Sequence, residues 1–450
     1  MLLEQFFDAG LGHASYLLAD PDEGVAMLVD PDRHLGPYLD AAAKMGVLIT
    51  HTFETHVHND YVSGSPALAA LRPITVVTGA EAKVGYPHLA LADGQMIVVG
   101  ALRVRCLATP GHTPEHVSYL VSDLSRADDP QLLFSGGALL VGHIARVDLL
   151  GKELEETLAA AAYETLRERV LSLQDYVAVF PTHGGGSACT SSSAAGSRWT
   201  TLGFERRHND VARAAMQDLA HFKSAIAHGL PIAPAYYPGV RALNHKGGAP
   251  FDPQALRSLR DPLPSDAALI DPRAPHVFAT GHRRGALNIV GNDSFAVRLG
   301  AVVPFGSPLV LLTTDREQAA TLRRQLATIG FDDVRGFADP VPDTGEELGR
   351  LRIVDARTAN RLAEDGALLI DVREDSEFEE GHAPGAMHIP YEQLQQRLAE
   401  VPRERDVIVY CAAGVRSSLA ASLLQKAGLD PINLRGGFAS WQSAGLPTEA

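Results

Sequence analysis

An internal repeat at a constant offset of 100 residues limits most strongly how this chain can fold. Its matching positions are Asp271, Arg273, Phe278, Gly281, His282, Gly285, Ala286 and Ile289 in the first copy and Asp371, Arg373, Phe378, Gly381, His382, Gly385, Ala386 and Ile389 in the second copy. Each copy continues into an apolar strand, a helix ending at Gly330 or Gly428, and a short strand. Repeated strand–helix units of this size predict two similar α/β domains, each with a parallel sheet.

The chain length supports more than one domain, because 450 residues are too many for a single hydrophobic core and suit two or three domains. We place the two repeat domains at 252–337 and 352–450. A segment rich in Pro, Gly and acidic residues, Ala338 to Arg350, is the predicted linker between them.

Residues 1–245 have a different pattern. Short β-rich runs such as VAMLVD, VLITHTFET and LRVRCLAT alternate with turns, and helical stretches intervene over 37–45 and 153–173. This mixture predicts two sheets with helices outside, an αββα sandwich. The predicted fold class is therefore α/β and α+β multidomain, with the sandwich followed by two α/β domains.

Charge and cysteine usage exclude several classes of protein. A net charge of −15 opposes non-specific nucleic-acid binding, which needs clustered Lys and Arg. Three cysteines, Cys106, Cys189 and Cys411, form no disulfide framework and suit a reducing compartment. The start of the chain lacks a signal-peptide pattern, and no apolar run reaches membrane-spanning length. We expect a soluble, cytoplasmic protein with no membrane or nucleic-acid partner.

Cys411 lies at the end of the predicted strand VIVYC, before a short loop and a helix. Free N–H groups of the loop and of the helix N-terminus would surround its sulfur and favour the thiolate or a persulfide anion. The loop residues that would supply them are Ala412, Ala413, Gly414 and Val415. Arg416 would add a cation at the rim for sulfite or thiosulfate. We expect the thiol to be open to solvent, with the amides directed toward it.

The segments DVREDSEFEEGHAPGAMHIP, CAAGVRS and LRGGFASW closely resemble rhodanese domains, across about 352–450. Four residues separate Cys411 from Arg416. The related dual-specificity phosphatases have one residue more, and the narrower loop favours sulfane sulfur over phosphate. The resemblance implies a sulfurtransferase with Cys411 as its nucleophile.

The first copy of the repeat lacks this nucleophile. Alignment of the helix ends places Thr313 at the position of Cys411, and the loop TTDREQ contains neither cysteine nor glycine. We interpret 252–337 as a rhodanese-like module without catalytic activity that packs against or orients the other domains. The alternative is a binding site for the same class of substrate.

Histidines follow several predicted strands of residues 1–245. The segment ETHVHNDY places His56, His58 and Asp60 at alternate positions of one loop, which suits ligands that converge on a metal ion. His112, in ATPGHTPEHVSYLV, and His183, in FPTHGGGSAC, each follow a further strand. Together these residues predict a metal centre.

The segments ETHVHNDYVSG, TPGHTPEHVSY, HGGGSAC and TLGFERRHN resemble the metallo-β-lactamase superfamily over about 1–245, and within it the persulfide dioxygenases fused to rhodaneses. The resemblance implies one Fe(II) held by two histidines and one aspartate, with open positions for O2 and a persulfide such as glutathione persulfide. Carried over by motif, the histidines are His56 and His112, and Arg146 would bind the glutathione carboxylate. A homo-oligomer is also implied.

One position departs from that family, because LLFSGGALLVG has Gly137 where members have the metal-binding aspartate. Two histidines alone would hold Fe(II) more weakly than two histidines and an aspartate. His58 could rotate inward, or His143 or Asp148 could move closer, to supply a third ligand. Zinc is the alternative ion. The same loss removes the aspartate that bridges two zinc ions in glyoxalase II-like hydrolases. Tyr61 also stands where those hydrolases place a histidine.

Two further cysteines lie in residues 1–245. Cys189 follows His183 in a Gly/Ser-rich segment, 183–197, and is either a second persulfide carrier near the metal centre or an incidental exposed thiol. Cys106 lies in an apolar strand and is predicted to pack in the core.

These features predict an enzyme of sulfide and persulfide metabolism. Its C-terminal domain would move sulfane sulfur between thiosulfate or sulfite and a thiol persulfide through Cys411. Its N-terminal domain, when metallated, would oxidise the persulfide to sulfite with O2. Because Gly137 and Thr313 remove groups from two of three sites, a persulfide-binding, sulfur-carrier or sensing protein is the alternative. A thioester metallohydrolase is the third choice.

Overall fold

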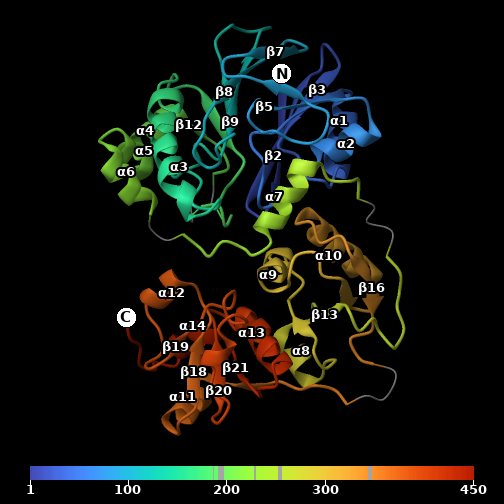
Figure 1. Cartoon of the computed structure of the whole chain (residues 1–450), viewed down its shortest axis with the longest axis vertical. Helices are drawn as coiled ribbons and strands as arrows, with labels where there is room; N and C mark the ends of the chain where they lie inside the picture. The colour runs from blue at the N-terminus through green and yellow to red at the C-terminus, as the bar shows by residue number, and fades with distance from the viewer. Residues whose placement is uncertain (186, 191–196, 228–229, 252–255, 343–346) are drawn as a thin grey trace. The chain divides into compact units, whose positions relative to one another are not determined.

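The computed structural model describes residues 1–185, 187–190, 197–227, 230–251, 256–342 and 347–450. Residues 1–251 with 327–330 form one compact unit, the first unit, and residues 252–326 with 331–450 form the second unit (Figure 1). Parts of the predicted linker and of the predicted Gly/Ser-rich segment, residues 343–346, 186 and 191–196, lie outside the described residues, and the domain bounds given above stay predictions. No helix in the described part of the chain is long and apolar enough to cross a membrane.

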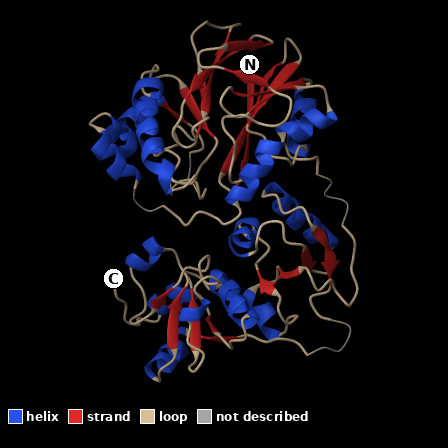
Figure 2. Cartoon of the chain, viewed as in Figure 1, coloured by secondary structure: helices blue, strands red, loops and turns tan. Residues whose placement is uncertain are grey.

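Two six-stranded sheets form the first unit (Figure 2). One has the order β1-β2-β3-β4-β5-β6, with β1 (Leu2–Asp8), β2 (His13–Asp20), β3 (Val25–Val29), β4 (Leu48–Phe53), β5 (Thr75–Gly79) and β6 (Leu89–Leu91). The other has the order β12-β11-β10-β9-β8-β7, with β7 (Met96–Val99), β8 (Leu102–Ala108), β9 (Val117–Asp123), β10 (Leu132–Gly136), β11 (Ala178–Pro181) and β12 (Thr200–Thr201).

Aromatic side chains from both sheets meet in the core between them. Tyr16 of β2 packs on Phe134 of β10, with ring centres 5.1 Å apart, and Phe53 of β4 packs on Tyr119 of β9 at 5.0 Å. Helices cover the two outer faces: α1 (Gly36–Met45) and α2 (Ser65–Leu71) on the first sheet, and α3 (Lys152–Glu164), α4 (Leu202–His208), α5 (Asp210–Ala215) and α6 (Leu219–Ile226) on the second. The predicted αββα sandwich is confirmed.

Local sequence explains where the predicted helices begin and end. Pro37 lies in the first turn of α1, where its missing N–H has no intrahelical partner to lose, and Gly46 ends the helix with a left-handed φ of 69°. The helix predicted over 153–173 is α3, which continues as a π-helical segment over Thr165–Val170.

The second unit holds two parallel sheets, one from each copy of the repeat, as the repeat predicts. The first copy has the order β14-β13-β15-β16, with β13 (Ala268–Asp271), β14 (Leu287–Asn288), β15 (Leu309–Leu312) and β16 (Val334–Ala338). The second has the order β17-β21-β20-β18-β19, with β17 (Arg352–Val354), β18 (Leu368–Asp371), β19 (Met387–His388), β20 (Val407–Tyr410) and β21 (Ile432–Leu434). The helices are α8 (Pro275–Thr280), α9 (Phe295–Val302) and α10 (Arg316–Thr328) in the first copy and α11 (Ala356–Glu364), α12 (Asp375–Glu379), α13 (Val415–Lys426) and α14 (Gly437–Ser443) in the second.

The repeated residues make the same contacts in both copies. Arg373 donates from Nε and Nη2 to the Asp371 carboxylate, at 3.0 and 2.6 Å, and from Nη2 to the Gly381 carbonyl at 2.7 Å. In the first copy, Arg273 donates from Nε and Nη2 to the Asp271 carboxylate at 2.9 and 2.6 Å, and from Nη2 to the Gly281 carbonyl at 3.0 Å. In each copy the motif therefore ties the end of a strand to the turn after the following helix.

The two copies also contact each other through α13. Ser418 Oγ donates to Asn288 Oδ1 at 2.5 Å, and the Asn288 amide donates to Ser422 Oγ at 3.1 Å. All three residues are buried. Since α13 starts just after the Cys411 loop, the first copy packs against the helix that shapes that loop.

Candidate active sites

Cys411 directly follows β20, and α13 begins four residues later at Val415. Gly414, between them, has a φ of 91°, a conformation that favours glycine. Its amide donates a hydrogen bond to Cys411 Sγ at 3.1 Å. The cysteine thus has the strand–loop–helix setting that the sequence predicts, with one loop amide directed at sulfur. The roles of Ala412, Ala413 and Val415 toward a substrate stay predictions.

The N-terminus of α14 closes the base of this loop. The Phe438 amide donates to the Cys411 carbonyl at 2.7 Å, and the Ala439 amide donates to the Ala412 carbonyl at 3.1 Å. A Cβ atom on Gly437 would lie only 2.1 Å from the Cys411 carbonyl oxygen, so no larger residue fits there. The segment LRGGFASW therefore helps to shape the cysteine loop directly.

The Cys411 side chain is enclosed. The residue is 2 % exposed, so the expectation of a thiol open to solvent is wrong. The Gly414 amide lies against the sulfur, and amides of α14 hold the backbone carbonyls of Cys411 and Ala412. The outer sulfur of a persulfide would extend farther by one S–S bond, about 2.05 Å.

Arg416 is paired with a residue that the sequence reasoning missed, Glu377 of α12. Arg416 Nη1 and Nη2 donate to the two oxygens of Glu377 at 2.6 and 2.7 Å. Burial alone would raise the pKa of Glu377, but the hydrogen bonds and charge of Arg416 lower it overall. Glu377 also accepts a bond from the Glu374 amide in a capping box, and the three-residue spacing of these glutamates was a readable signal. The rim cation is therefore held in place and partly neutralised.

Further titratable groups surround the Cys411 loop. Arg298 of α9, in the first copy, has its pKa lowered by burial, and its charge is influenced by Tyr391, Arg416 and Cys411. Burial also raises the pKa of Glu392 to about 7, with Glu374 raising it further and Tyr391 and Arg416 opposing the shift. Both repeat copies thus contribute to the electrostatics of the loop.

Thr313 directly follows β15, as Cys411 directly follows β20. Its hydroxyl donates to Gln318 Oε1 at 2.6 Å and accepts from the Asp315 amide at 3.1 Å. α10 begins three residues after Thr313, so this loop is one residue shorter than the Cys411 loop. The first copy therefore has a hydroxyl, already hydrogen-bonded within its own loop, at the position of the thiol.

In the first unit, the predicted metal-binding histidines meet in one buried cluster. Ring centres are 4.9 Å apart for His56 and His112, 5.4 Å for His56 and His183, and 5.3 Å for His112 and His183. Each follows a strand of the sandwich: β4, β8 and β11. The loops that follow these strands bring together residues that lie far apart in the sequence.

Hydrogen bonds orient these imidazoles. His56 Nδ1 lies 2.9 Å from the Thr55 hydroxyl, and His112 Nδ1 lies 2.7 Å from the Arg146 carbonyl. His56 Nε2 and His183 Nε2 are buried with no hydrogen-bond partner in the described residues. Burial first, and neighbouring histidines second, lower the pKa of His56 and His112 well below the usual value. Neutral imidazoles with a free nitrogen are the form that binds metals.

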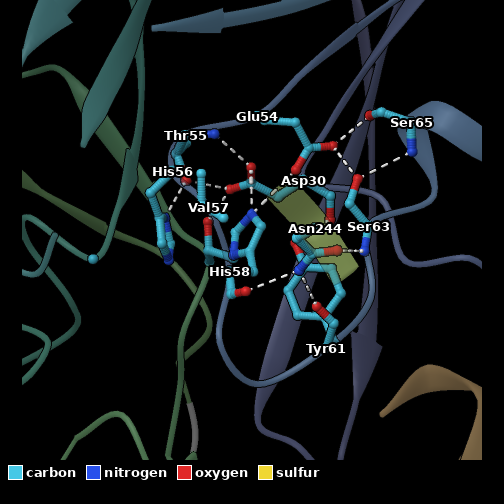
Figure 3. Close-up of polar contacts among 12 residues, drawn as sticks. Asp30, Glu54, Thr55, His56, Val57, His58, Tyr61, Ser63, Ser65 and Asn244 are labelled. Atoms are coloured by element: carbon cyan, nitrogen blue, oxygen red, sulfur yellow. Dashed lines mark hydrogen bonds and ion pairs between the residues drawn. The ribbon is translucent and has the colours of Figure 1, made fainter. Parts of the chain in front are cut away.

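His58 is held by two carboxylates rather than free to rotate inward (Figure 3). Its Nε2 lies 3.1 Å from Asp30 Oδ1 and 3.3 Å from Glu54 Oε2. Burial alone would lower the pKa of His58, but these two carboxylates raise it to about 10. Its Nδ1 has no hydrogen bond among the described residues. The Tyr61 hydroxyl donates to the Asp30 carbonyl at 3.1 Å, so Tyr61 supports this loop.

Gly137 faces the cluster without offering a ligand. A Cβ atom at this position would lie 2.9 Å from His112 Cδ2 and 2.8 Å from Ala145 Cβ. The neighbouring acid does not replace the missing carboxylate, because Asp148 is bound by Arg146 Nε and Nη2, each at 2.6 Å.

His143 faces a neighbouring carbonyl, whereas Asp60 lies against His183 and both of its carboxylate oxygens are buried with no hydrogen bond among the described residues. His143 Nδ1 lies 2.7 Å from the Ile144 carbonyl, and Asp60 Oδ2 lies 3.4 Å from His183 Nδ1. Within the described residues, the groups of donor atoms around the shared His183 are His56–His58–His183 and His112–His183–Cys189, each within 4.8 Å, and neither contains a carboxylate. Neither group repeats the two-histidine, one-aspartate set implied by the resemblance, in which the aspartate falls at position 137, but the Asp60 carboxylate lies beside the histidine that the two groups share.

Cys189 is fully buried, so its interpretation as an exposed thiol is wrong. The Arg146 amide donates to the Cys189 carbonyl at 2.9 Å, and Arg146 Nη1 donates to the Ala188 and Pro231 carbonyls at 3.2 and 2.6 Å. The binding of a glutathione carboxylate by Arg146 stays a prediction. Cys106 of β8 is buried in the core, as predicted.

Comparisons with known proteins find relatives of the rhodanese-like region and of the persulfide dioxygenases. A family model described as a rhodanese-like domain matches residues 349–444. A sulfurtransferase of Allochromatium vinosum is 38% identical over 94 residues, which are 20% of this chain and 88% of that protein. The mitochondrial persulfide dioxygenase ETHE1 of Homo sapiens is 29% identical over 189 residues, 41% of this chain and 68% of that protein.

Two further proteins are similar to parts of this chain. A hydroxyacylglutathione hydrolase-like protein of Homo sapiens is 41% identical over 119 residues, 26% of this chain, and the chain spans only 40% of that protein. A crystal structure of a metallo-β-lactamase from Staphylococcus aureus is 30% identical, with a TM-score of 0.70 over 76% of this chain and 99% of that chain.

An αββα sandwich with a buried histidine cluster, followed by a parallel sheet with a cysteine loop, defines a metallo-β-lactamase-fold domain joined to a rhodanese-like domain. The chain belongs to the metallo-β-lactamase-fold proteins that carry a C-terminal rhodanese domain.

Proposed function

We propose that the chain is a sulfurtransferase of persulfide metabolism that moves sulfane sulfur between thiosulfate or sulfite and a low-molecular-weight thiol persulfide, such as glutathione persulfide. The observation that carries this proposal is the Cys411 loop, in which the Gly414 amide donates to Sγ at 3.1 Å and Arg416 is fixed by Glu377. A relative matched over 88% of its length is named a sulfurtransferase.

The reaction has two steps at one sulfur atom. The Cys411 thiolate attacks the outer sulfur of thiosulfate, the S–S bond of thiosulfate breaks, and sulfite leaves with the bonding electron pair. Cys411 then carries a persulfide. An acceptor thiolate attacks the outer sulfur of that persulfide, forms the new S–S bond, and releases the Cys411 thiolate. No external oxidant or reductant is needed.

The residues of the loop have distinct parts in this scheme. The Gly414 amide stabilises negative charge on Sγ before attack and after release, because a hydrogen bond to an anion is stronger than one to a neutral acceptor. Arg416 offers its cation to the anionic donor from a position set by Glu377. The enclosed setting of Cys411 favours small donors such as thiosulfate.

Substitution of the nucleophile tests the proposal. Cys411→Ser is expected to abolish thiosulfate–thiol sulfur transfer, measured as thiol persulfide formed per unit time. Thr313→Ala, at the equivalent position of the first copy, is the matched control and should keep the wild-type rate. Mass spectrometry of wild-type protein after thiosulfate should show one added sulfur atom on the peptide with Cys411. Full activity in Cys411→Ser would overturn the assignment.

A second candidate, a sulfur carrier or persulfide sensor, is favoured by one observation, the burial of Cys411 at 2 % exposure. A carrier would load one sulfur per chain and release it only to a dedicated partner. A rate assay separates the two functions: repeated turnover with thiosulfate and a free thiol supports the enzyme, and a single loading event supports the carrier. We assign no oxygenase step to the first unit, because the resemblance implies a metal-binding aspartate at the position where this chain has Gly137.

A further inference from the structure

A cysteine joins the histidine cluster of the first unit. Cys189 offers Sγ, and His112 and His183 each offer a ring nitrogen, with the three atoms within 4.8 Å of one another. All three residues are at most 3 % exposed. Gly137, which leaves the gap, faces the ring of His112 in the same cluster. One thiol and two imidazoles thus converge where the iron ligand set is incomplete.

Each of the two imidazoles has one ring nitrogen left for a ligand. Nδ1 of His112 faces the Arg146 carbonyl at 2.7 Å, which selects the tautomer with a free Nε2. His183 Nε2 is buried and has no hydrogen bond among the described residues. Cys189 Sγ has hydroxyl neighbours, Ser187 and Tyr237, and the Tyr237 hydroxyl is 3.7 Å away, a distance at the weak end for sulfur. Leaving such polar groups unsatisfied in the interior costs free energy, and a bound ion would remove that cost.

One residue positions two of the three ligands through its backbone. The Arg146 carbonyl accepts from His112 Nδ1, while the Arg146 amide donates to the Cys189 carbonyl at 2.9 Å. The Arg146 side chain also donates to the carbonyl of Ala188, next to Cys189, and is itself fixed by Asp148. The loops that carry His112 and Cys189 are therefore held together at the place where a metal would join them.

We propose that His112, His183 and Cys189 bind a thiophilic divalent ion, with zinc preferred, in place of the iron site of the related dioxygenases. Zinc bonds of about 2.0–2.3 Å to nitrogen and sulfur hold tetrahedral ligand atoms about 3.3–3.8 Å apart, so the three atoms need to close by at most about 1.0–1.5 Å. Soft thiolate with imidazole selects zinc over iron(II). Three protein ligands leave one position for a sulfur anion. This inference does not depend on transfer through Cys411.

Cobalt(II) substitution tests the site in the full-length protein. Metal-free wild type titrated with Co²⁺ should bind one ion per chain and show the intense visible bands of a tetrahedral site together with thiolate-to-cobalt charge-transfer absorption in the near ultraviolet. Cys189→Ser should lose the charge-transfer absorption and bind Zn²⁺ more weakly by at least about tenfold, the lower end of the loss caused by removing outer partners of a metal site.

The other two cysteines provide matched controls. Cys106→Ser, in the core of the same unit, and Cys411→Ser should both keep the charge-transfer absorption. X-ray absorption on zinc-loaded wild type needs no variant and should show one sulfur at about 2.3 Å with nitrogen at about 2.0–2.1 Å. A zinc site with nitrogen and oxygen neighbours alone, no bound ion, or charge-transfer absorption that persists in Cys189→Ser would each overturn the proposal.

Discussion

Single residues decide which chemistry each site can hold. Gly137 offers no side chain to the histidine cluster, and Thr313 puts a hydroxyl where the second copy has a thiol. Glu377 holds Arg416 in two hydrogen bonds and thereby sets the charge beside Cys411. Each of these three effects comes from one side chain, or from its absence, within a backbone that both related families share.

Restoring the carboxylate at position 137 is expected to cost stability. The new Cβ would lie 2.8 Å from Ala145 Cβ and 2.9 Å from the His112 ring, so Gly137→Asp should lose about 1–3 kcal/mol from overpacking. Ala145→Gly makes room, and the same Asp substitution should cost less in that background. Urea denaturation of the two single variants and the double variant measures the coupling. If the stability changes of the two single variants simply add up in the double variant, Ala145 does not cause the strain at position 137.

Glu392 should make stability depend on pH near neutrality. Burial raises its pKa to about 7 from 4.5, so the folded protein holds this proton more tightly than the unfolded chain. The corresponding stability is fully present below pH 4.5 and is lost as the pH rises through 7, by up to about 3 kcal/mol. Glu392→Gln should therefore gain stability relative to wild type more at pH 8 than at pH 5.

The control for this measurement is Glu400→Gln. Arg397 lowers the pKa of Glu400, so that group is ionised at both pH values and its removal should leave the difference between pH 5 and pH 8 unchanged. An equal pH dependence in wild type and Glu392→Gln would contradict the assignment.

Among the elements, α9 and α13 link the inactive copy to the active one. Ser418 and Ser422 of α13 bind Asn288 of the first copy, and Arg298 of α9 is electrostatically coupled to Cys411 and Arg416. The first copy therefore does more than fill space: it supports the helix after the cysteine loop and adds a cation near it.

Removal of the Arg298 charge should weaken the use of an anionic sulfur donor. Arg298→Gln is expected to raise the KM for thiosulfate by about three- to tenfold, roughly the effect of a screened charge worth about 1 kcal/mol. The matched control is Arg316→Gln on the next helix along the chain, α10, at an exposed position. Steady-state kinetics with thiosulfate and with an uncharged organic trisulfide donor separates charge from folding effects, since the uncharged donor should be unaffected. Equal losses with both donors would point to a structural role instead.

At the scale of the whole molecule, zinc should stabilise the first unit selectively. At a free concentration of 100 times its Kd, an ion that binds only the folded state adds about 2.7 kcal/mol, which corresponds to about 5–10 °C in Tm for a unit of this size. The chain has two tryptophans, Trp199 in the first unit and Trp441 in the second. Trp441→Phe and Trp199→Phe therefore leave one fluorescent reporter in each unit.

The reporter in the first unit should show the increase in Tm, and the reporter in the second unit should not. Cys189→Ser should abolish the increase. A shift of equal size in the second unit would place the zinc outside the histidine cluster.

Local patterns predicted much of this molecule. The 100-residue repeat predicts the two parallel sheets, and strand–loop–helix signals place Cys411 at the end of β20. Strand-end histidines predict the cluster, because ends of neighbouring strands meet at one edge of a sandwich. What the pattern could not supply are contacts set by tertiary packing: the enclosure of Cys411, the Glu377–Arg416 pair, and Cys189 beside His112. These contacts depend on the conformations of loops, which the hydrophobic periodicity of the sequence does not predict.

The backbone of Arg146 touches the residues on both sides of the proposed zinc site, while its guanidinium binds Asp148. An anionic thiol compound could compete with Asp148 for that guanidinium. Its binding would move the Arg146 backbone groups that hydrogen-bond to His112 and Cys189. Occupancy by the compound and occupancy by the metal would then be thermodynamically linked, each altering the affinity for the other by the same factor. In that case the affinity of the first unit for its metal ion would change with the concentration of such a compound.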